Sequence, residues 1–304
     1  MKAGNKKRVL CLARTAGFCF GVRRAIRMAH ILAKKSVAPR ATLASPRLRG
    51  EPGEVNMLGD LVHNQDVIAL LEKSGIKKIA RLGNGRNKIL LIRAHGAGKH
   101  LITKAGKRGY KIADATCPMV RAIHKIVKKM DKKGYRIIVI GDRHHDEVQG
   151  IVGQITKKTL IIDKTENIPW PQIKKINKAA IVVQSTQSME HVLPIVDTLK
   201  SKVEEIKFFN TICRPTRMKQ AEMKNLPRLN DVVIIIGSRE SANTRRLFEI
   251  SREINPRSYW IESADQIKPR WFRNAKKIGI TAGASTPDSA TSAVIARIRN
   301  MTVT

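Results

Sequence analysis

The chain contains few cysteines and few aromatic residues for its length. Its four cysteines are scattered over 304 residues, which is unlike the dense disulfide framework of small secreted domains and favours metal binding or catalysis. Aromatic residues make up 4% of the chain, and no basic stretch is interleaved with aromatics as in proteins that stack nucleic-acid bases. The cysteine usage therefore excludes a disulfide scaffold, and the aromatic content disfavours a base-stacking surface.

Long apolar runs are also lacking. A helix that spans a bilayer needs roughly 20 apolar residues, and no run in the chain approaches that length. The basic start of the chain is followed only by the short apolar stretch 9–13 before Arg14, so no signal peptide is predicted. We therefore expect a soluble, cytoplasmic protein without a membrane partner.

Acidic residues are greatly outnumbered by basic ones. The chain holds 59 lysines and arginines against 24 aspartates and glutamates, a net charge of +35. Such an excess is typical of proteins that bind nucleic acid or another polyanion. The basic residues are spread over nearly every predicted helix rather than gathered in a tail. A solvated surface, a nucleic-acid partner and an acidic protein partner therefore all stay open on charge alone.

Short runs of branched apolar residues recur along the chain, as is typical of buried parallel strands. Segments with helical spacing of apolar residues, such as 22–32 and 120–130, lie between them. The alternation predicts an α/β fold, and the length suggests two or three domains. The predicted strands are 9–13, 89–92, 137–140, 179–183, 232–236 and 278–280.

Small and polar residues follow each predicted strand directly. Ligands of open α/β sheets bind at the carboxyl ends of strands, so six such segments predict one composite site. The segments are Thr15-Ala16-Gly17-Phe18-Cys19, Ala94-His95-Gly96, His144-His145-Asp146-Glu147, Gln184-Ser185-Thr186, Gly237-Ser238-Arg239-Glu240-Ser241 and Thr281-Ala282-Gly283-Ala284-Ser285.

Three of the cysteines are almost evenly spaced. Cys19, Cys117 and Cys213 lie 98 and 96 residues apart, which predicts three similar units. We expect α/β units over residues 1–117, 118–212 and 213–304, the last ending in a helix. A Pro-, Arg- and Gly-rich stretch at about 36–53 is expected to be an exposed loop inserted in the first unit.

Each of these three cysteines stands where a loop is predicted to turn into a helix. A helix N-terminus favours the thiolate, which is the form that binds iron. Three thiolates can hold a [4Fe–4S] cluster and leave one iron open, whereas zinc ligands usually come in Cys-x2–4-Cys pairs, which the sequence lacks. Three small buried residues are the plainer interpretation, which the repeat disfavours. Cys11 lies inside an apolar strand and is expected in the core.

Three histidines recur in similar contexts, at His63, His95 and His145. With hydroxyl and amide side chains they offer donors suited to a diphosphate, and the P-loop pattern that would bind phosphates with a lysine is absent from the sequence. Glu147 is the expected proton donor, because removing a hydroxyl as water requires a general acid. The alternative is a surface glutamate in a loop.

The motifs around these residues resemble those of the 4-hydroxy-3-methylbut-2-enyl diphosphate reductase family. The resemblance covers roughly residues 9–301, nearly the whole chain. The motifs that carry it are Gly17-Phe18-Cys19-x-Gly21-Val22-x-Arg24-Ala25, Val62-His63-Asn64, Ala94-His95-Gly96, Asp114-Ala115-Thr116-Cys117-Pro118, His145-x-Glu147-Val148-x-Gly150, Gln184-Ser185-Thr186, Asn210-Thr211-Ile212-Cys213, Gly237-Ser238-x-x-Ser241-x-Asn243 and Thr281-Ala282-Gly283-Ala284-Ser285-x-Pro287-Asp288.

The resemblance implies three similar α/β domains with parallel sheets, arranged as a cloverleaf around a central iron–sulfur cavity. It implies one [4Fe–4S] cluster with three ligands, Cys19, Cys117 and Cys213, and one open iron. The residues it implies for substrate binding are His63, His95, His145, Ser185, Thr186, Ser241, Asn243 and Ser285. Those it implies for catalysis are Glu147, Thr186 and His145.

The implied activity is that of an oxidoreductase in the methylerythritol phosphate pathway of isoprene biosynthesis. It converts (E)-4-hydroxy-3-methylbut-2-enyl diphosphate to isopentenyl and dimethylallyl diphosphate, the last step of that pathway, with two electrons from ferredoxin or flavodoxin. Glu147 with Thr186 would handle the hydroxyl that leaves as water.

Several positions depart from the family pattern. Ala242 stands where a second serine is usual, and a lost hydrogen bond to a charged group costs on the order of 1.5–3 kcal/mol. Ser185 stands for threonine and Lys219 for arginine, and the remaining departures are Pro215, Arg245 and Arg246. With the charge of +35, they keep open the alternative of a divergent homologue that binds nucleic acid or another polyanion.

Overall fold

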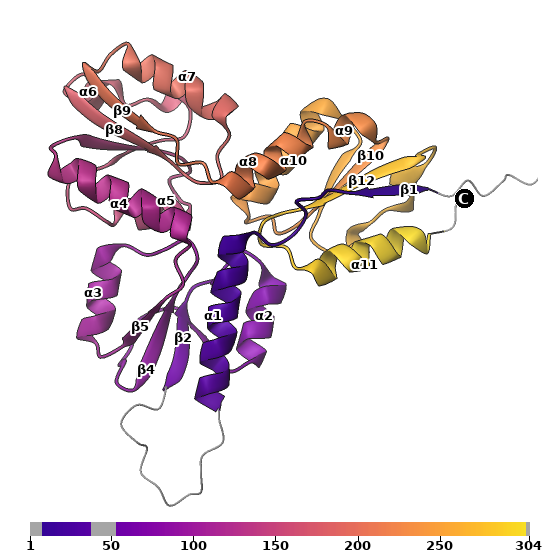
Figure 1. The fold of residues 1–304 in the computed structure, drawn as a ribbon, viewed down its shortest axis with the longest axis horizontal. Coiled ribbons are helices and arrows are strands. Elements are labelled where there is room, and N and C mark those ends of the chain that lie inside the picture. The colour runs from indigo at the N-terminus through magenta and orange to yellow at the C-terminus, as the bar shows by residue number, and fades with distance from the viewer. Residues whose placement is uncertain (1–7, 38–52, 302–304) are drawn as a thin grey trace, which may run out of the picture. The chain divides into compact units, whose positions relative to one another are not determined.

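The structure is a computed structural model that describes residues 8–37 and 53–301. Within these residues the chain forms three four-stranded sheets, and each strand pair in them is parallel (Figure 1). Helices alternate with the strands along the chain. The predicted α/β class with parallel sheets is therefore confirmed.

Two of the sheets are built from consecutive segments of the chain. The first has the strand order β3-β2-β4-β5 and the second β7-β6-β8-β9. The elements of the first stretch are α1 (Phe20–Val37), β2 (Glu54–Leu58), α2 (Gln65–Lys73), β3 (Lys77–Ile79), β4 (Lys88–Ile92), α3 (Lys99–Lys107) and β5 (Lys111–Asp114). Those of the second are α4 (Pro118–Lys132), β6 (Arg136–Ile140), α5 (Asp146–Val152), β7 (Leu160–Ile162), η1 (Thr165–Asn167), α6 (Trp170–Ile173), β8 (Lys178–Val183), α7 (Met189–Lys200) and β9 (Glu205–Phe209).

The third sheet joins the two ends of the chain. Its order is β1-β12-β10-β11, so the strand nearest the N-terminus pairs with the last strand, with Leu10 opposite Ile278. Its elements are β1 (Val9–Leu12), α8 (Arg214–Met223), α9 (Leu226–Leu229), β10 (Val232–Ile236), α10 (Ala242–Ile254), β11 (Ser258–Ile261), η2 (Ala264–Gln266), η3 (Pro269–Phe272), β12 (Lys277–Ala282) and α11 (Asp288–Arg299).

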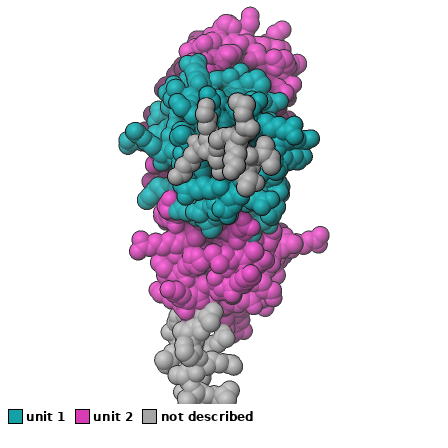
Figure 2. Space-filling model, turned by 90° about the vertical axis from the view of Figure 1, so that its right-hand side faces the viewer, with its two compact units in different colours: residues 1–20, 63–65, 213–304 teal, residues 21–62, 66–212 magenta. Residues whose placement is uncertain are grey.

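The described residues divide into two compact units (Figure 2). Unit 1 comprises residues 8–20, 63–65 and 213–301, and it contains the third sheet. Unit 2 comprises residues 21–37, 53–62 and 66–212, and it contains the other two sheets. The expected boundaries at 117 and 212 stay a prediction.

The central strands read as unbroken apolar runs because both of their faces are covered. Alternate side chains of a strand point to opposite faces of its sheet. Ile138 and Ile140 of β6 belong to one core cluster, whereas Ile137 and Val139 belong to another. In β10, Val232, Ile234 and Ile236 are likewise separated from Val233 and Ile235.

All six predicted strands are present, as β1, β4, β6, β8, β10 and β12. The expectation of burial is wrong for β1, where Val9 is 53% and Leu12 50% exposed, because this strand lies at the edge of its sheet. Of the predicted loop at 36–53, residues 36 and 37 end α1, and 38–52 lie outside the described residues. No helix among the described residues is both long and apolar enough to cross a membrane.

Candidate functional site

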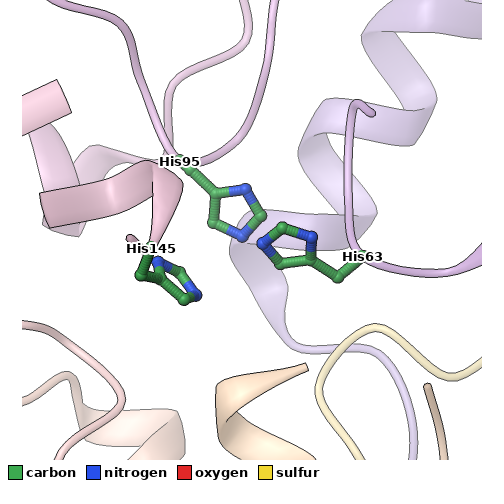
Figure 3. A group of neighbouring side chains, drawn as sticks. All are labelled: His63, His95 and His145. Atoms are coloured by element: carbon green, nitrogen blue, oxygen red, sulfur yellow. The ribbon is translucent and has the colours of Figure 1, made fainter. Parts of the chain in front are cut away.

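Two histidines predicted to bind substrate lie next to each other in unit 2. His95 follows β4 and His145 follows β6, and their ring centroids are 5.4 Å apart at an interplanar angle of 84° (Figure 3). His145 is 8% exposed and His95 is half-buried. Strand ends from two different sheets therefore contribute to one group of side chains.

The two loops meet because glycines let α5 approach the loop after β4. A β-carbon on Gly150 would lie 3.2 Å from the carbonyl oxygen of His95, and one on Gly153 would lie 2.6 Å from Cα of Gly98. The Gln154 side-chain amide donates to the carbonyl of Ala97 at 2.8 Å. A larger residue at Gly153 would force this backbone apart, so the contact requires glycine.

His145 caps the N-terminus of α5. Its Nδ1 accepts a hydrogen bond from the backbone N–H of Glu147 at 3.1 Å. A nitrogen that accepts cannot carry the proton of a neutral imidazole, so Nε2 is the protonated, donating atom of this tautomer. The cap thus fixes one donor of the group.

Glu147 is buried immediately behind this cap. It is 2% exposed, and its carboxylate oxygens accept hydrogen bonds from the backbone N–H of Ser185 at 2.6 Å and from the Ser185 hydroxyl at 2.8 Å. Burial raises the pKa of the Glu147 carboxyl above its usual value, and the two bonds from Ser185 offset only part of that effect. Glu147 is therefore a group that retains its proton at higher pH than an exposed glutamate.

The resemblance implies that Glu147 and Thr186 act together on the substrate hydroxyl, and the structure shows that Glu147 is hydrogen-bonded to the neighbouring Ser185. The Thr186 hydroxyl accepts a hydrogen bond from the Gln184 side-chain amide at 3.1 Å, and Thr186 itself is half-buried. Both residues stand at the carboxyl end of β8. The catalytic role of Thr186 stays a prediction.

Two features of this group were missed by sequence reasoning. Arg93, at the end of β4, forms an ion pair of 2.5 Å with Asp146, the residue between His145 and Glu147. His124 of α4 lies under the turn after His95, since a β-carbon on Gly96 would be 2.7 Å from its Cε1.

Burial, and then the nearby charge of Lys128, lower the pKa of His124 to about 4, so its ring is neutral at physiological pH. The sequence signal available for the ion pair was the opposite charge of Arg93 and Asp146, which stand next to the two histidine motifs. No sequence signal marked His124, because it lies on the apolar face of its helix.

A second group of predicted residues lies in unit 1. Ser241 caps α10 by accepting the N–H of Thr244 at 3.3 Å, and the Asn243 side-chain oxygen accepts the N–H of Ala284 at 3.0 Å. The Ser285 hydroxyl donates to the backbone carbonyl of His63 at 3.0 Å. The loops after β10 and β12 and the short segment 63–65 are thereby joined.

Asn243 presents a buried donor within this second group. The residue is 3% exposed, and its Nδ2 has no hydrogen-bond partner among the described residues. A buried amide donor without a partner costs free energy unless a ligand satisfies it. This atom is suited to an anionic oxygen.

The three evenly spaced cysteines all stand at helix N-termini. Cys117 and Cys213 are the residues directly before α4 and α8, and Cys19 directly precedes α1. Backbone hydrogen bonds join Cys19 to Ala284 at 3.1 Å and Cys117 to Ala94 at 2.9 Å. The four cysteines, all within the described residues, form no disulfide, and these three are half-buried.

Cysteine sulfurs are the usual ligands of iron–sulfur clusters, so these three residues are candidate ligands. Cys11 lies in β1, as expected, but is half-buried rather than fully in the core.

The chain is similar to known proteins over nearly its whole length. The family described as LytB protein matches residues 10–299. A 4-hydroxy-3-methylbut-2-enyl diphosphate reductase from Geobacter metallireducens is 37% identical over 292 residues, covering 96% of this chain and 97% of the relative. The reductase of the same name from Aquifex aeolicus is 36% identical over 295 residues and 96% of both chains.

Two solved structures are similar over nearly the whole chain. One, described as (E)-4-hydroxy-3-methyl-but-2-enyl diphosphate reductase, the terminal enzyme of the non-mevalonate pathway, matches with a TM-score of 0.70 at 35% identity, covering 97% of this chain and 100% of that one. The other is E-1-hydroxy-2-methyl-but-2-enyl-4-diphosphate reductase from Plasmodium falciparum, with a TM-score of 0.82 at 28% identity, covering 97% and 89%. The fold and the sequence together define the class of protein: an α/β oxidoreductase of the non-mevalonate pathway.

The chain belongs to the LytB family of 4-hydroxy-3-methylbut-2-enyl diphosphate reductases. The resemblance recognised from the motifs is thereby confirmed. None of these relatives is described as a nucleic-acid-binding protein, and that alternative has no support.

The raised pKa of Glu147 makes the stability of the protein depend on pH. Between the ordinary pKa of 4.5 and the raised pKa, the folded state holds a proton that the unfolded state has released, so stability falls as pH rises through this window. Glu147→Gln removes the titration but keeps the shape. We expect its melting temperature, relative to that of the unchanged protein, to increase from pH 4.5 upward.

Thermal melts over pH 4 to 8 measure this difference, because 1 kcal/mol shifts the midpoint of a 150–250-residue domain by roughly 2–4 °C. A difference in melting temperature that stays constant with pH contradicts the raised pKa.

Proposed function

We propose that this chain reduces (E)-4-hydroxy-3-methylbut-2-enyl diphosphate to isopentenyl and dimethylallyl diphosphate, with loss of the hydroxyl as water. The observation that carries the proposal is membership of the reductase family over residues 10–299. The surroundings of two of the predicted site residues, Asn243 and Glu147, fit the substrate's anionic and hydroxyl ends.

The residues that the family resemblance implies for binding the diphosphate carry hydrogen-bond donors. In unit 1 the donors are the Ser241 hydroxyl and the amide of Asn243, which is buried and has no acceptor among the described residues. The Ser285 hydroxyl, which donates to the His63 carbonyl, would have to rotate to donate to the diphosphate. The histidines His63, His95 and His145 complete the set. Hydrogen bonds to a charged acceptor are stronger than those between neutral groups, so several such donors together favour a diphosphate.

Glu147 would supply the proton that leaves with the hydroxyl. Its raised pKa favours the protonated form, and its two oxygens accept hydrogen bonds from the backbone N–H and the hydroxyl of Ser185. Ser185 therefore orients the acid, and Thr186 stands next to it on the same strand end.

Cys19, Cys117 and Cys213 would hold a [4Fe–4S] cluster with one open iron. Their positions at helix N-termini fit thiolate ligation. When bound, such a cluster supplies electrons and a Lewis-acidic iron. Ferredoxin or flavodoxin would provide the two electrons, and the cytoplasm is the compartment that suits these partners.

Replacing one ligand tests the assignment of the cluster. We expect Cys117→Ser to reduce bound iron from about four atoms per chain to near none and to abolish reduction of the substrate by dithionite and viologen. Cys11→Ser is the matched control, since Cys11 is also half-buried but lies within β1. Iron analysis after anaerobic purification measures the first quantity. A Cys117→Ser protein that kept its iron and its activity would rule out the assignment.

Opposite changes at two adjacent positions test the residues proposed to bind the diphosphate. Asn243→Asp keeps the oxygen that accepts the Ala284 N–H but replaces the donor with an anionic oxygen, so we expect the substrate Kd to rise at least about tenfold. Ala242→Ser adds a hydroxyl at the first residue of α10, and we expect Kd to fall or stay unchanged. Calorimetric titration with the diphosphate measures both. Equal affinity of Asn243→Asp and the unchanged protein contradicts this assignment.

The basic surface would help to attract the electron donor. Helix α4, which begins after Cys117, carries the exposed residues Lys125, Lys128, Lys129 and Lys132. Its one acidic residue, Asp131, is paired with Lys157 at 3.6 Å. Such a surface complements an acidic ferredoxin or flavodoxin.

The rate with an acidic protein donor should therefore fall as salt rises, by roughly tenfold or more between low and high ionic strength. The rate with a reduced viologen, which carries no acidic surface, should change little. Steady-state assays with both donors across a salt series separate the two cases. An equal salt response with both donors would show that the charge plays no part in recruitment.

A further inference from the structure

Helix α8 carries two charged side chains on one face that contact the loop before Cys19. This loop, residues 13–19, is called the Cys19 loop below. Lys219 and Glu222 are three residues apart, which places them on the same side of the helix. Both contacts lie within unit 1 and join segments more than 200 residues apart in the sequence.

Lys219 is a buried cation that binds backbone carbonyls. It is 3% exposed, and its Nζ donates to the carbonyl oxygens of Gly17 and Ala282, each at 3.0 Å, and to that of Thr15. An ammonium group has three donors, so these carbonyls saturate it. Burying a charge is costly unless it is fully hydrogen-bonded, which is the condition that the loop meets here.

Glu222 binds the opposite groups of the same loop. Its Oε1 accepts the N–H of Arg14 at 2.6 Å, and its Oε2 accepts the N–H of Thr15 at 3.0 Å and the Thr15 hydroxyl at 2.5 Å. The carbonyl oxygens of the loop are thus held by a cation and its N–H groups by an anion. Hydrogen bonds with one charged partner are about twice as strong as neutral ones.

The loop needs such support because its backbone is in neither a helix nor a strand. Gly17 has a φ of +85°, and a β-carbon there would lie 2.9 Å from the Asp288 carboxylate. The N–H groups of Gly17 and Cys19 bond to the carbonyls of Ala282 and Ala284. The loop is therefore tied to the strand end of β12 on one side and to α8 on the other.

We propose that Lys219 and Glu222 are positioning residues that hold the Cys19 loop on helix α8, which also carries Cys213 at its N-terminus. The protein itself then sets the places of these two thiols. This rests on the proposed role of Cys19 and Cys213 as ligands. Cys117 belongs to unit 2 and is not part of the loop that Lys219 and Glu222 contact.

Thiol reactivity in the full-length protein tests the proposal. In protein purified without iron, we expect Lys219→Met and Glu222→Ala each to increase the alkylation rate of Cys19 by iodoacetamide about tenfold or more, because loss of charged hydrogen bonds opens the loop. The rate at Cys117 should stay unchanged and serves as an internal reference. Lys219→Arg keeps the charge and several donors, and it should recover most of the protection.

Arg217→Met is the matched control, because Arg217 is an exposed basic residue of the same helix. Mass spectrometry locates the modified cysteines, and amide hydrogen exchange of the peptide spanning residues 13–19 gives a second measurement that does not depend on thiol chemistry. We expect faster exchange in Lys219→Met and Glu222→Ala, and none of this change in Arg217→Met.

Unchanged alkylation and exchange in both variants would overturn the proposal. If Lys219→Met does not fold, as judged by circular dichroism, Glu222→Ala decides the outcome alone. Neither measurement uses the substrate or a reductant. A failed reductase assay and a loop that Lys219 and Glu222 do not hold are therefore separate results. If Lys219 and Glu222 protect the loop in a protein that lacks reductase activity, their positioning role stands and the proposed ligand role of Cys19 and Cys213 is contradicted.

Discussion

The close approach of α5 to the loop after β4 is the contact on which the placement of His95, His145 and Glu147 depends. Gly150 and Gly153 let the two backbones touch, and Gln154 bonds across them. That contact brings His95 beside His145, and the cap that His145 provides places Glu147 in the interior. Without glycine at these positions the two strand ends would be held apart by side-chain volume.

Buried ionisable groups play opposite parts in the two units. In unit 2, Glu147 is buried and accepts two hydrogen bonds from Ser185, and burial favours its neutral form. In unit 1, Lys219 is buried among carbonyl oxygens that accept its hydrogen bonds. The first environment suits a group that gives up a proton, and the second suits a group that holds a backbone in place.

The strands were predictable because their signal is local. Ile137 to Ile140 form an unbroken branched apolar run, which is typical of a strand covered on both faces. The positions of the candidate residues after strands were predictable from the same local signal, and the rule that parallel sheets bind ligands there made them candidates. Contacts such as Glu147 with Ser185 and Arg93 with Asp146 were not, because they depend on distances between segments tens of residues apart.

By itself, the sequence determined the α/β class, the family, and which cysteines, histidines and carboxyl groups are candidates for chemistry. These follow from residue types and their spacing, which need no coordinates. The tertiary structure decided that β1 pairs with β12, that Ser185 hydrogen-bonds to Glu147, and that Lys219 and Glu222 contact the Cys19 loop. The reason is physical: hydrogen bonds and burial act over a few ångströms, and only the folded chain sets which distant segments come within that range.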